Sequence, residues 1–423
     1  QIVPHVSNEI KNKIYEAATS SGADIVITEI GGTVGDIESA VMMESLRQFR
    51  LETGHENSLF VHTTLVPYLF GSNELKTKPT QNSIIELRRL GIQPDIIVTR
   101  APIDLGESVK KKISLFGSIP AENIIEAKDV NNIYQIPINF HKQHIEDIIL
   151  NQFHLKITKS NLETWQNLIK TTESLKDEIE IALVGKYVEL EDAYLSVKEA
   201  LASAGYKYHT KIKIKWVNSE ELEQENCNLK EVFKNSKGII VPGGFGGRGI
   251  EGMINACEYA RTNKIPYLGI CLGMQIAVIE FARHVCKLPD TSSREFDELC
   301  VNPVIDLMAD QKAIINKGGT LRLGNYKCKI TKGTLAYEDY KSEEILERHR
   351  HRYEFNNSYK KLLASKGMIF SGINPESNLV EIIELKDHPH FIACQFHPEF
   401  KSRPTRPHPL FDSFIKASID SKK

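Results

Sequence analysis

Short apolar runs that predict buried strands alternate with helix-forming segments along most of this chain, and they do so in two separate series. The strands predicted in the first series are 24–30, 58–66, 95–100 and 123–128, and those beginning the second are 179–186, 211–217, 238–244 and 267–270. Parallel strands need long crossovers, usually helices, so this alternation predicts α/β domains with mainly parallel sheets.

The two series are separated by a stretch of different composition. Apolar runs thin out from about residue 155 to 177, and polar residues increase there. A length of 423 residues suits two or three domains. We therefore predict a first domain over 1–155, a linker with room for one helix over 156–178, and a second domain over 179–423.

Composition excludes several classes of protein. The formal net charge is −2, so no global basic field indicates nucleic acid as a partner. No apolar run approaches the roughly 20 residues of a membrane-spanning helix. Seven cysteines occur without a C-x-x-C pair, which argues against a zinc site and a disulfide framework and favours a reducing, cytoplasmic location.

The strongest chemical signal is the segment 266–275, PYLGICLGMQ. A predicted strand, Tyr267 to Ile270, is followed by Cys271 between two flanking glycines and then by a helix-forming run. This G-x-C-x-G pattern matches a nucleophile elbow, whose glycines permit a tight turn and close backbone approach. The nearby helix N-terminus would favour the thiolate. The alternative is a small residue buried in a sheet core.

A base and an orienting acid follow in QFHPEF, where His397 and Glu399 are two residues apart. In an extended segment, residues i and i+2 point to the same side, so the carboxylate can orient the imidazole. The glycine-dense loop 241–249, with the N–H of Leu272, would supply an oxyanion hole. The basic run 347–354 would grip a substrate carboxylate or form a solvated surface.

In the first domain, Glu29, Asp36 and Glu38 surround a Gly-rich turn. Magnesium is usually bound by a few protein carboxylates together with the phosphates of the substrate. Lys76, Lys78 and Lys112 would neutralise phosphate, although most such residues are simply solvated.

Three motifs, PGGFGGRG, GICLGMQ and QFHPE, resemble those of the class I glutamine amidotransferases. Further blocks, among them IGGTVGDIES, KTKPTQ, GIQPD, LVGKYVELEDAY, ERHRHRYE and HPLF, resemble the CTP synthase family. The resemblance runs almost end to end. It implies that the second domain hydrolyses glutamine, that ammonia passes through an internal channel, and that the first domain uses ATP to convert UTP to CTP.

The resemblance also implies site residues. The catalytic triad would be Cys271, His397 and Glu399, and the glutamine site Gly244, Leu272, Gly273, Met274, Gln275, Glu295 and Arg352. UTP or CTP would bind Asp36, Ile37, Glu38, Lys76, Thr77, Lys78, Pro79, Thr80, Gln81 and Lys112. Lys128, Asp129 and Val130 would lie beside ATP, and Glu29 would bind Mg²⁺. The family implies GTP as an allosteric activator and a homotetramer.

One departure concerns the phosphate loop of the family, which is related to G-x-x-x-x-G-K-[ST]. The pair Gly185-Lys186 lacks the upstream glycine and leads into Tyr187. We expect a chain beginning after that loop to keep the glutaminase machinery and to fail at ligation. Two alternatives remain open: an amidotransferase with a different acceptor, and a non-catalytic, regulatory fragment.

Overall fold

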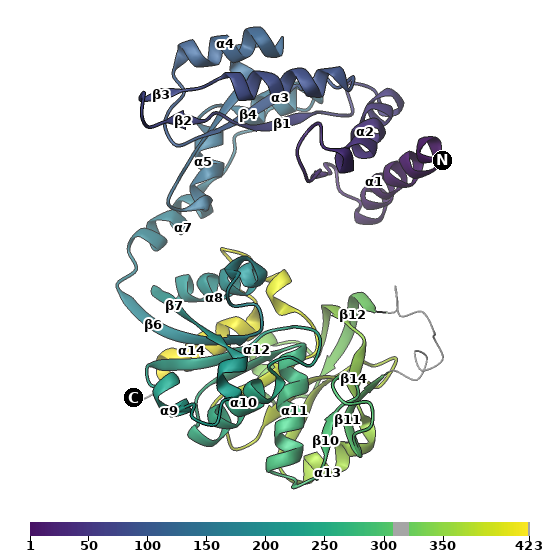
Figure 1. Ribbon diagram of the computed structural model, residues 1–423, viewed down its shortest axis with the longest axis vertical. Helices are drawn as coiled ribbons and strands as arrows, with labels where there is room; N and C mark the ends of the chain where they lie inside the picture. Colours follow the sequence, from purple (N-terminus) through teal and green to yellow (C-terminus); the bar gives the residue numbers. More distant parts are fainter. Residues whose placement is uncertain (308–320, 422–423) are drawn as a thin grey trace. The chain divides into compact units, whose positions relative to one another are not determined.

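A computed structural model describes residues 1–307 and 321–421. The chain forms two compact units, Gln1–Ile169 and Lys170–Lys423, which are considered separately (Figure 1). In the described ranges, every helix is too short or too polar to span a lipid bilayer.

The described part of the first unit is built on a three-stranded parallel sheet. Its order is β1 (Val61–Leu65), β4 (Ile96–Ala101) and β5 (Ile124–Lys128). Alternate residues of β4 face opposite sides: Ile97 packs with α3 (Lys78–Arg89) and α4 (Glu107–Gly117), whereas Ile96 and Val98 pack with α5 (Ile136–His141) and α6 (Ile145–Gln152). This confirms the predicted parallel α/β layering.

Two further helices, α1 (Ser7–Ser21) and α2 (Ala40–Thr53), pack against each other in this unit. An ion pair between Lys11 and Glu52 joins them. The unit also contains β2 (Tyr68–Leu69), β3 (Glu74–Leu75), and the short helices η1 (Ile2–Val6), η2 (Ile37–Ser39), η3 (Ala121–Asn123) and η4 (Ile133–Gln135). Helix α7 (Glu163–Glu173) begins in this unit and ends in the next.

The prediction of a buried strand over 24–30 is wrong. The segment is irregular, and the Ile27 side chain is 91% exposed. An apolar run becomes a strand only where a neighbouring strand takes up its backbone hydrogen bonds. Among the described residues, the parallel sheet of this unit ends at β1, and residues 24–30 pair with no strand.

The second unit contains a nine-stranded sheet among its described residues. Its order is β13 (Glu344–His351), β12 (Arg322–Ile330), β15 (Met368–Ile373), β16 (Val380–Leu385), β17 (Phe391–Cys394), β9 (Tyr267–Ile270), β8 (Ser236–Val241), β6 (Asp177–Gly185) and β7 (Thr210–Asn218). Strands from β17 to β7 pair in parallel, and those from β13 to β17 are antiparallel.

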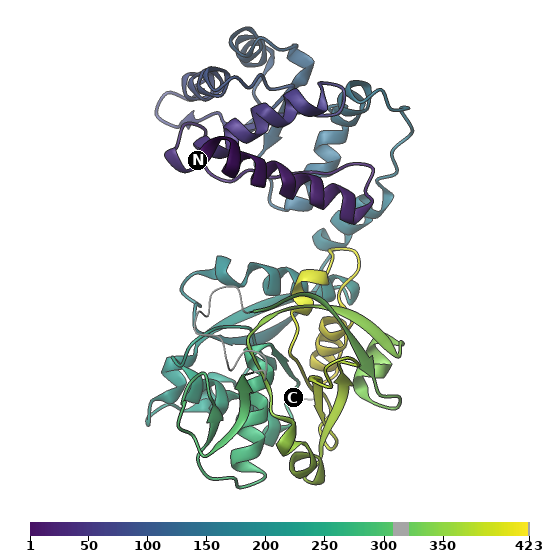
Figure 2. The same ribbon diagram turned by 90° about the vertical axis from the view of Figure 1, so that its right-hand side faces the viewer.

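Helices cover both faces of the parallel half (Figures 1 and 2). One core joins α10 (Ile250–Asn263) and α11 (Leu272–His284) to alternate strand residues such as Ala182 and Val184. The other joins α8 (Leu195–Lys207), α12 (Leu335–Tyr340) and α14 (Pro409–Asp420) to the intervening Ile181 and Leu183. Burial on both faces explains why these strands are continuous apolar runs.

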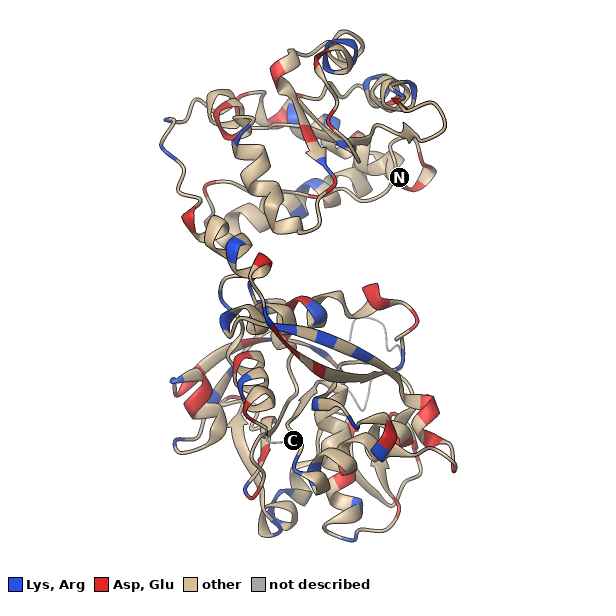
Figure 3. Ribbon diagram, turned by 90° about the vertical axis from the view of Figure 1, so that its left-hand side faces the viewer, with Lys and Arg blue, Asp and Glu red and all other residues tan. Residues whose placement is uncertain are grey.

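A smaller three-stranded sheet among the described residues consists of β10 (Thr291–Ser293), β11 (Asn302–Leu307) and β14 (Tyr353–Phe355). The remaining short helices are η5 (Glu191–Tyr194), η6 (Ser219–Glu223), α9 (Leu229–Val232), η7 (Asn357–Tyr359), α13 (Lys360–Ser365) and η8 (Pro398–Lys401). Basic and acidic residues are interspersed over both units, in keeping with the small net charge (Figure 3).

Candidate active site

Cys271 lies between β9 and α11 with φ 54° and ψ −100°, a conformation that side-chain-bearing residues rarely adopt. The turn is held by its packing. A Cβ on Gly273 would lie 2.0 Å from the carbonyl oxygen of Val241, so only glycine fits there. The N–H of Cys271 donates to the carbonyl of Cys394, 2.7 Å away on the adjacent strand β17. Such backbone strain is typical of a nucleophile elbow.

His397 and Glu399 meet at the end of the strand next to this elbow. Nδ1 of His397 lies 2.7 Å from Oε1 of Glu399, and both side chains are largely buried. The chain turns into η8 after His397, so this contact comes from a helical turn rather than from the extended segment expected.

His397 also interacts with the Cys271 thiol. Burial acts to lower the pKa of His397, but the charge and hydrogen bond of Cys271, together with those of Glu399, outweigh burial and raise this pKa to about 10. The imidazolium form is therefore favoured beside the sulfur. This pairing of thiol, imidazole and carboxylate is the arrangement used in nucleophilic acyl transfer.

A cavity of about 230 Å³ opens at these side chains. Its wall includes Tyr187, Asp192, Tyr194, Gly243, Gly244, Cys271, Arg350, His397 and Glu399. A Cβ on Gly243 would lie 2.8 Å from Cε1 of His397 and 3.6 Å from Cβ of Cys271. The absence of a side chain at this position therefore leaves room beside the sulfur.

Lys186 holds the glycine loop that forms one wall of the cavity. Its ammonium donates to the carbonyls of Phe245, 3.1 Å away, and Gly246. Burial lowers the pKa of Lys186 to about 8. From the other side, Oε1 of Glu295 accepts from the N–H of Gly246 at 2.9 Å. Leu272 begins α11, where no preceding helical carbonyl is available to its N–H, so this donor suits an oxyanion.

The predicted glutamine-site residues differ in where they lie relative to the cavity. Gly244 lines the cavity, and Leu272 to Gln275 form the buried start of α11. Glu295 and Arg352 lie outside the residues that line it, although Glu295 contacts the glycine loop. Arg350, on β13 within the basic run predicted from the sequence, lines the cavity instead.

The basic run of β13 alternates between two environments. Glu347, His349 and His351 are buried, whereas Arg348 and Arg350 are exposed. Strand periodicity explains this alternation. The carbonyl of Arg348 accepts from the N–H of His397 at 2.8 Å, which ties the run to the candidate active site.

The buried side of β13 is supported by an ion-pair network. Nη2 of Arg322 lies 2.7 Å from Oε1 of Glu381, and Nε2 of His349 lies 2.7 Å from Oε2 of the same carboxylate. Burial acts to raise the pKa of Glu381, but these two partners outweigh it and lower the pKa. The charge on Glu381 is thus compensated inside the unit.

In the first unit, two of the predicted nucleotide residues, Thr80 and Lys128, lie at the carboxyl edge of the parallel sheet. The Thr80 hydroxyl donates to the carbonyl of Leu65 at 2.8 Å, which places the start of α3 at the carboxyl end of β1. Lys128 ends β5, where Ala101 of β4 is its register partner. Ligands of open parallel sheets bind at this edge. Lys76 and Lys78 are exposed there.

The other predicted residues of this unit differ in exposure, and Thr77, Thr80 and Gln81 are buried. Asp36 to Glu38 and Lys112 are exposed, as is Glu29. Lys128 pairs with Asp104, and Asp129 with Arg100, each at 2.9 Å.

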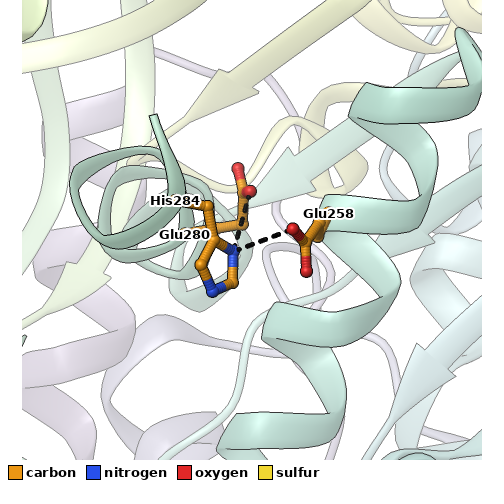
Figure 4. Close-up of side chains that lie close together, drawn as sticks. All are labelled: Glu258, Glu280 and His284. Carbon is orange, nitrogen blue, oxygen red and sulfur yellow. Dashed lines mark hydrogen bonds and ion pairs between the residues drawn. The ribbon is translucent and has the colours of Figure 1, made fainter. Parts of the chain in front are cut away.

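A group of potential metal ligands among the described residues lies in the second unit instead. Glu258 of α10 and Glu280 and His284 of α11 converge (Figure 4). However, Arg261 makes paired hydrogen bonds to Glu280, 2.6 Å from Nη2 to Oε1 and 2.9 Å from Nε to Oε2. This carboxylate is already neutralised, so the group is better described as an ion-pair network linking two helices.

Sequence reasoning missed Lys186 and Gln395, whose Nε2 lies 3.7 Å from Sγ of Cys271, and did not name Arg350 individually. From the sequence, Lys186 was considered as part of a phosphate loop and within the block LVGKYVELEDAY, without an assigned role. Lysines are rarely buried, so its place at the end of an apolar strand was the available signal. Arg350 lies within the basic run already singled out. For Gln395, the only local indication of a role in the site is its position two residues before His397.

The elbow on a parallel sheet, the neighbouring histidine and carboxylate, and the glycine loop define a class I glutamine amidotransferase. Residues 189–417 match the family described as "Glutamine amidotransferase class-I", and residues 1–155 match "CTP synthase N-terminus". The chain belongs to the CTP synthase family.

Named relatives support this assignment over the whole chain. It is 53% identical to the CTP synthase of Caldanaerobacter subterraneus subsp. tengcongensis and 51% identical to that of Bacillus subtilis, in each case over 100% of this chain and 78% of the relative. It is also similar to the solved "Trypanosoma brucei CTPS - glutaminase domain with bound acivicin", at 37% identity and TM-score 0.54, over 58% of this chain and 95% of that one. The two alternatives left open by the sequence are not favoured.

Proposed function

We propose that the protein makes CTP from UTP, ATP and glutamine, with glutamine hydrolysis in the second unit and ligation in the first. The proposed division of labour assigns residues 1–155 to ligation, 156–178 to a linker and 179–423 to the glutaminase. The observation that carries the glutaminase half is the convergence of Cys271, His397 and Glu399 on one cavity.

In the first half-reaction, the Cys271 thiolate attacks the carboxamide carbon of glutamine, while His397 holds the proton taken from the thiol. The tetrahedral oxyanion accepts hydrogen bonds from backbone N–H groups of Gly244 and Leu272. His397 then protonates the leaving nitrogen, and ammonia departs to leave a thioester. The thiolate route divides one difficult amide hydrolysis into two easier steps.

In the second half-reaction, His397 takes a proton from water, which attacks the thioester. The sulfur leaves as a thiolate and glutamate is released. Glu399 keeps the imidazole oriented through its contact with Nδ1. We assign Gly244, Leu272, Gly273, Met274, Gln275, Glu295 and Arg352 to glutamine binding. The arginine suits the substrate carboxylate because its guanidinium can bind it in a bidentate manner.

For the first unit, we propose that ATP activates the 4-oxygen of UTP by phosphorylation and that ammonia displaces the phosphate. The proposed UTP or CTP site is Asp36 to Glu38, Lys76 to Gln81 and Lys112, and the proposed ATP contacts are Lys128 to Val130. The exposed Glu29 carboxylate fits Mg²⁺, which uses few protein ligands. Bound there, Mg²⁺ would neutralise phosphate charge. Further proposals are activation by GTP, a homotetramer, a cytoplasmic location, and no nucleic-acid or membrane partner.

The test compares Cys271→Ala with Cys286→Ala, since Cys286 is half-buried and outside the cavity. We expect Cys271→Ala to abolish glutamate release, and Cys286→Ala to retain it. Cys271→Ala should still form CTP from added ammonium. Glutaminase activity surviving in Cys271→Ala would refute the assignment of the nucleophile. If the wild type formed CTP neither from glutamine nor from ammonium, the ligase assignment would be refuted.

A further inference from the structure

Gln395 contacts the sulfur of the elbow from the side of the sheet. Its Nε2 lies 3.7 Å from Sγ of Cys271, within reach of an N–H···S hydrogen bond, and the side chain is fully buried. Gln395 follows β17, whose register with β9 brings Cys394 beside Ile270. Its own N–H donates to the carbonyl of Glu381 at 2.9 Å, so its backbone position is fixed.

A second amide fixes which end of the Gln395 side chain faces the sulfur. Nε2 of Gln275 lies 3.0 Å from the carbonyl oxygen of Tyr353 and 3.4 Å from Oε1 of Gln395. A carbonyl can only accept, so the Gln275 amide must present its NH₂ group to Tyr353. Turning the Gln395 amide over would set two NH₂ groups against each other. The hydrogen-bond chain therefore directs the Gln395 NH₂ group toward Cys271.

We propose, on the basis of the glutaminase function proposed above, that Gln395 is a further catalytic residue whose side-chain N–H stabilises the Cys271 thiolate. A buried thiolate has lost water donors and depends on protein donors in their place. His397 must give up its proton to the leaving nitrogen, whereas a carboxamide keeps its protons throughout. Gln395 thus remains a donor when the sulfur leaves as a thiolate during hydrolysis of the thioester.

Tyr353 begins β14 and directly follows Arg352, a proposed glutamine contact. The carbonyl that anchors the two amides therefore belongs to the residue next to that arginine along the chain. The titratable groups that line the cavity with Cys271 are His397, Glu399, Arg350, Asp192, Tyr187 and Tyr194. Cys394, on the adjacent strand, is also close to the Cys271 charge. Substitution at Gln395 leaves all of these groups in place.

The test measures alkylation of the Cys271 thiolate by iodoacetamide as a function of pH. The sulfur displaces iodide, so this reaction needs neither glutamine nor an acceptor. Gln395→Met removes the donor at similar length, and Gln395→Glu replaces the NH₂ group by an oxygen. Asn374→Asp is the matched control, because Asn374 is an equally buried amide bonded to Lys327 and residues 376–377 rather than to the sulfur. Cys271→Ala supplies the background from the other six cysteines.

We expect the pH of half-maximal alkylation to rise by about one unit in Gln395→Met and by more in Gln395→Glu, with kcat of the glutaminase falling about tenfold and KM little changed. Asn374→Asp should leave the alkylation profile unchanged. A purely structural role would lower Tm without moving the midpoint. An unchanged midpoint in whichever Gln395 variants fold would overturn the proposal, while glutaminase activity in Cys271→Ala would instead overturn the function on which it depends.

Discussion

Nδ1 of His397 lies 2.7 Å from Oε1 of Glu399, although Pro398 alone separates the two residues and η8 begins between them. The contact leaves the other ring nitrogen available for the sulfur. It also means that the protonation of His397 depends on two partners of different kinds, a permanent carboxylate and a thiol that changes charge during the reaction.

Substitution of Cys271 should therefore be visible in the titration of His397. Because the thiol contributes to raising the pKa of His397 to about 10, Cys271→Ala should lower it toward the ordinary value near 6.5. NMR titration of the imidazole measures this directly. Glu399→Gln should also lower this pKa, and an unaltered titration in both variants would contradict the proposed coupling.

The same shift predicts how stability depends on pH. A base whose pKa is raised by folding contributes stability that is fully present below its unfolded pKa near 6.5 and is lost as pH rises through about 10. The free energy of unfolding of the wild type, relative to Cys271→Ala, should thus decrease between these limits. Urea unfolding at several pH values measures the difference, and an increase over this window would be the wrong sign.

A side chain at Gly243 should impair catalysis more than folding. Its Cβ would lie 2.8 Å from Cε1 of His397, the end of a side chain, so Gly243→Ala should displace the imidazole. Misplacement of a reacting group by about 1 Å costs on the order of 10²-fold in rate, so we expect a loss of that size in glutaminase kcat/KM. Gly71→Ala, where a Cβ would meet no atom within 4 Å, is the control. A Gly243→Ala enzyme with normal kcat/KM would show that the imidazole has more freedom than its packing indicates.

Arg322→Met should destabilise the second unit strongly. It leaves Glu381 with one partner fewer in a buried site, and breaking such a pair typically costs about 3–5 kcal/mol. Lys332→Met removes an exposed pair with Glu343 and should leave the unfolding midpoint near that of the wild type. Thermal and urea unfolding distinguish the two variants. Equal midpoints would mean that the buried network adds nothing to stability.

In the proposed nucleotide site, Lys78→Gln should weaken CTP binding. Lys78 is exposed at the first turn of α3, where both the ammonium and the helix N-terminus favour phosphate. Loss of one charge-assisted contact predicts about tenfold weaker binding by calorimetry. Lys142→Gln, at an exposed position ending α5, should bind as the wild type does. Equal affinities would remove Lys78 from the site.

Local pattern was sufficient wherever neighbouring residues decide the conformation. The strand Tyr267–Ile270 and the α11 helix after it follow from an apolar run, a glycine-flanked turn and a helix-forming segment. Residues 24–30 carry a comparable apolar run but form no strand, because no described strand pairs with it. The basic composition of the run 347–354 did not predict which of its side chains are buried. The burial of His349 and His351 depends on the elements that pack against β13.

The sequence by itself determined the α/β class, the elbow at Cys271, and the family to which the chain belongs. Tertiary structure alone decided that Gln395 reaches the sulfur and that Gln275, 120 residues earlier, orients it. The physical reason is that spacing along a chain governs only neighbouring residues. Contacts between distant segments depend on the order and register in which strands pair.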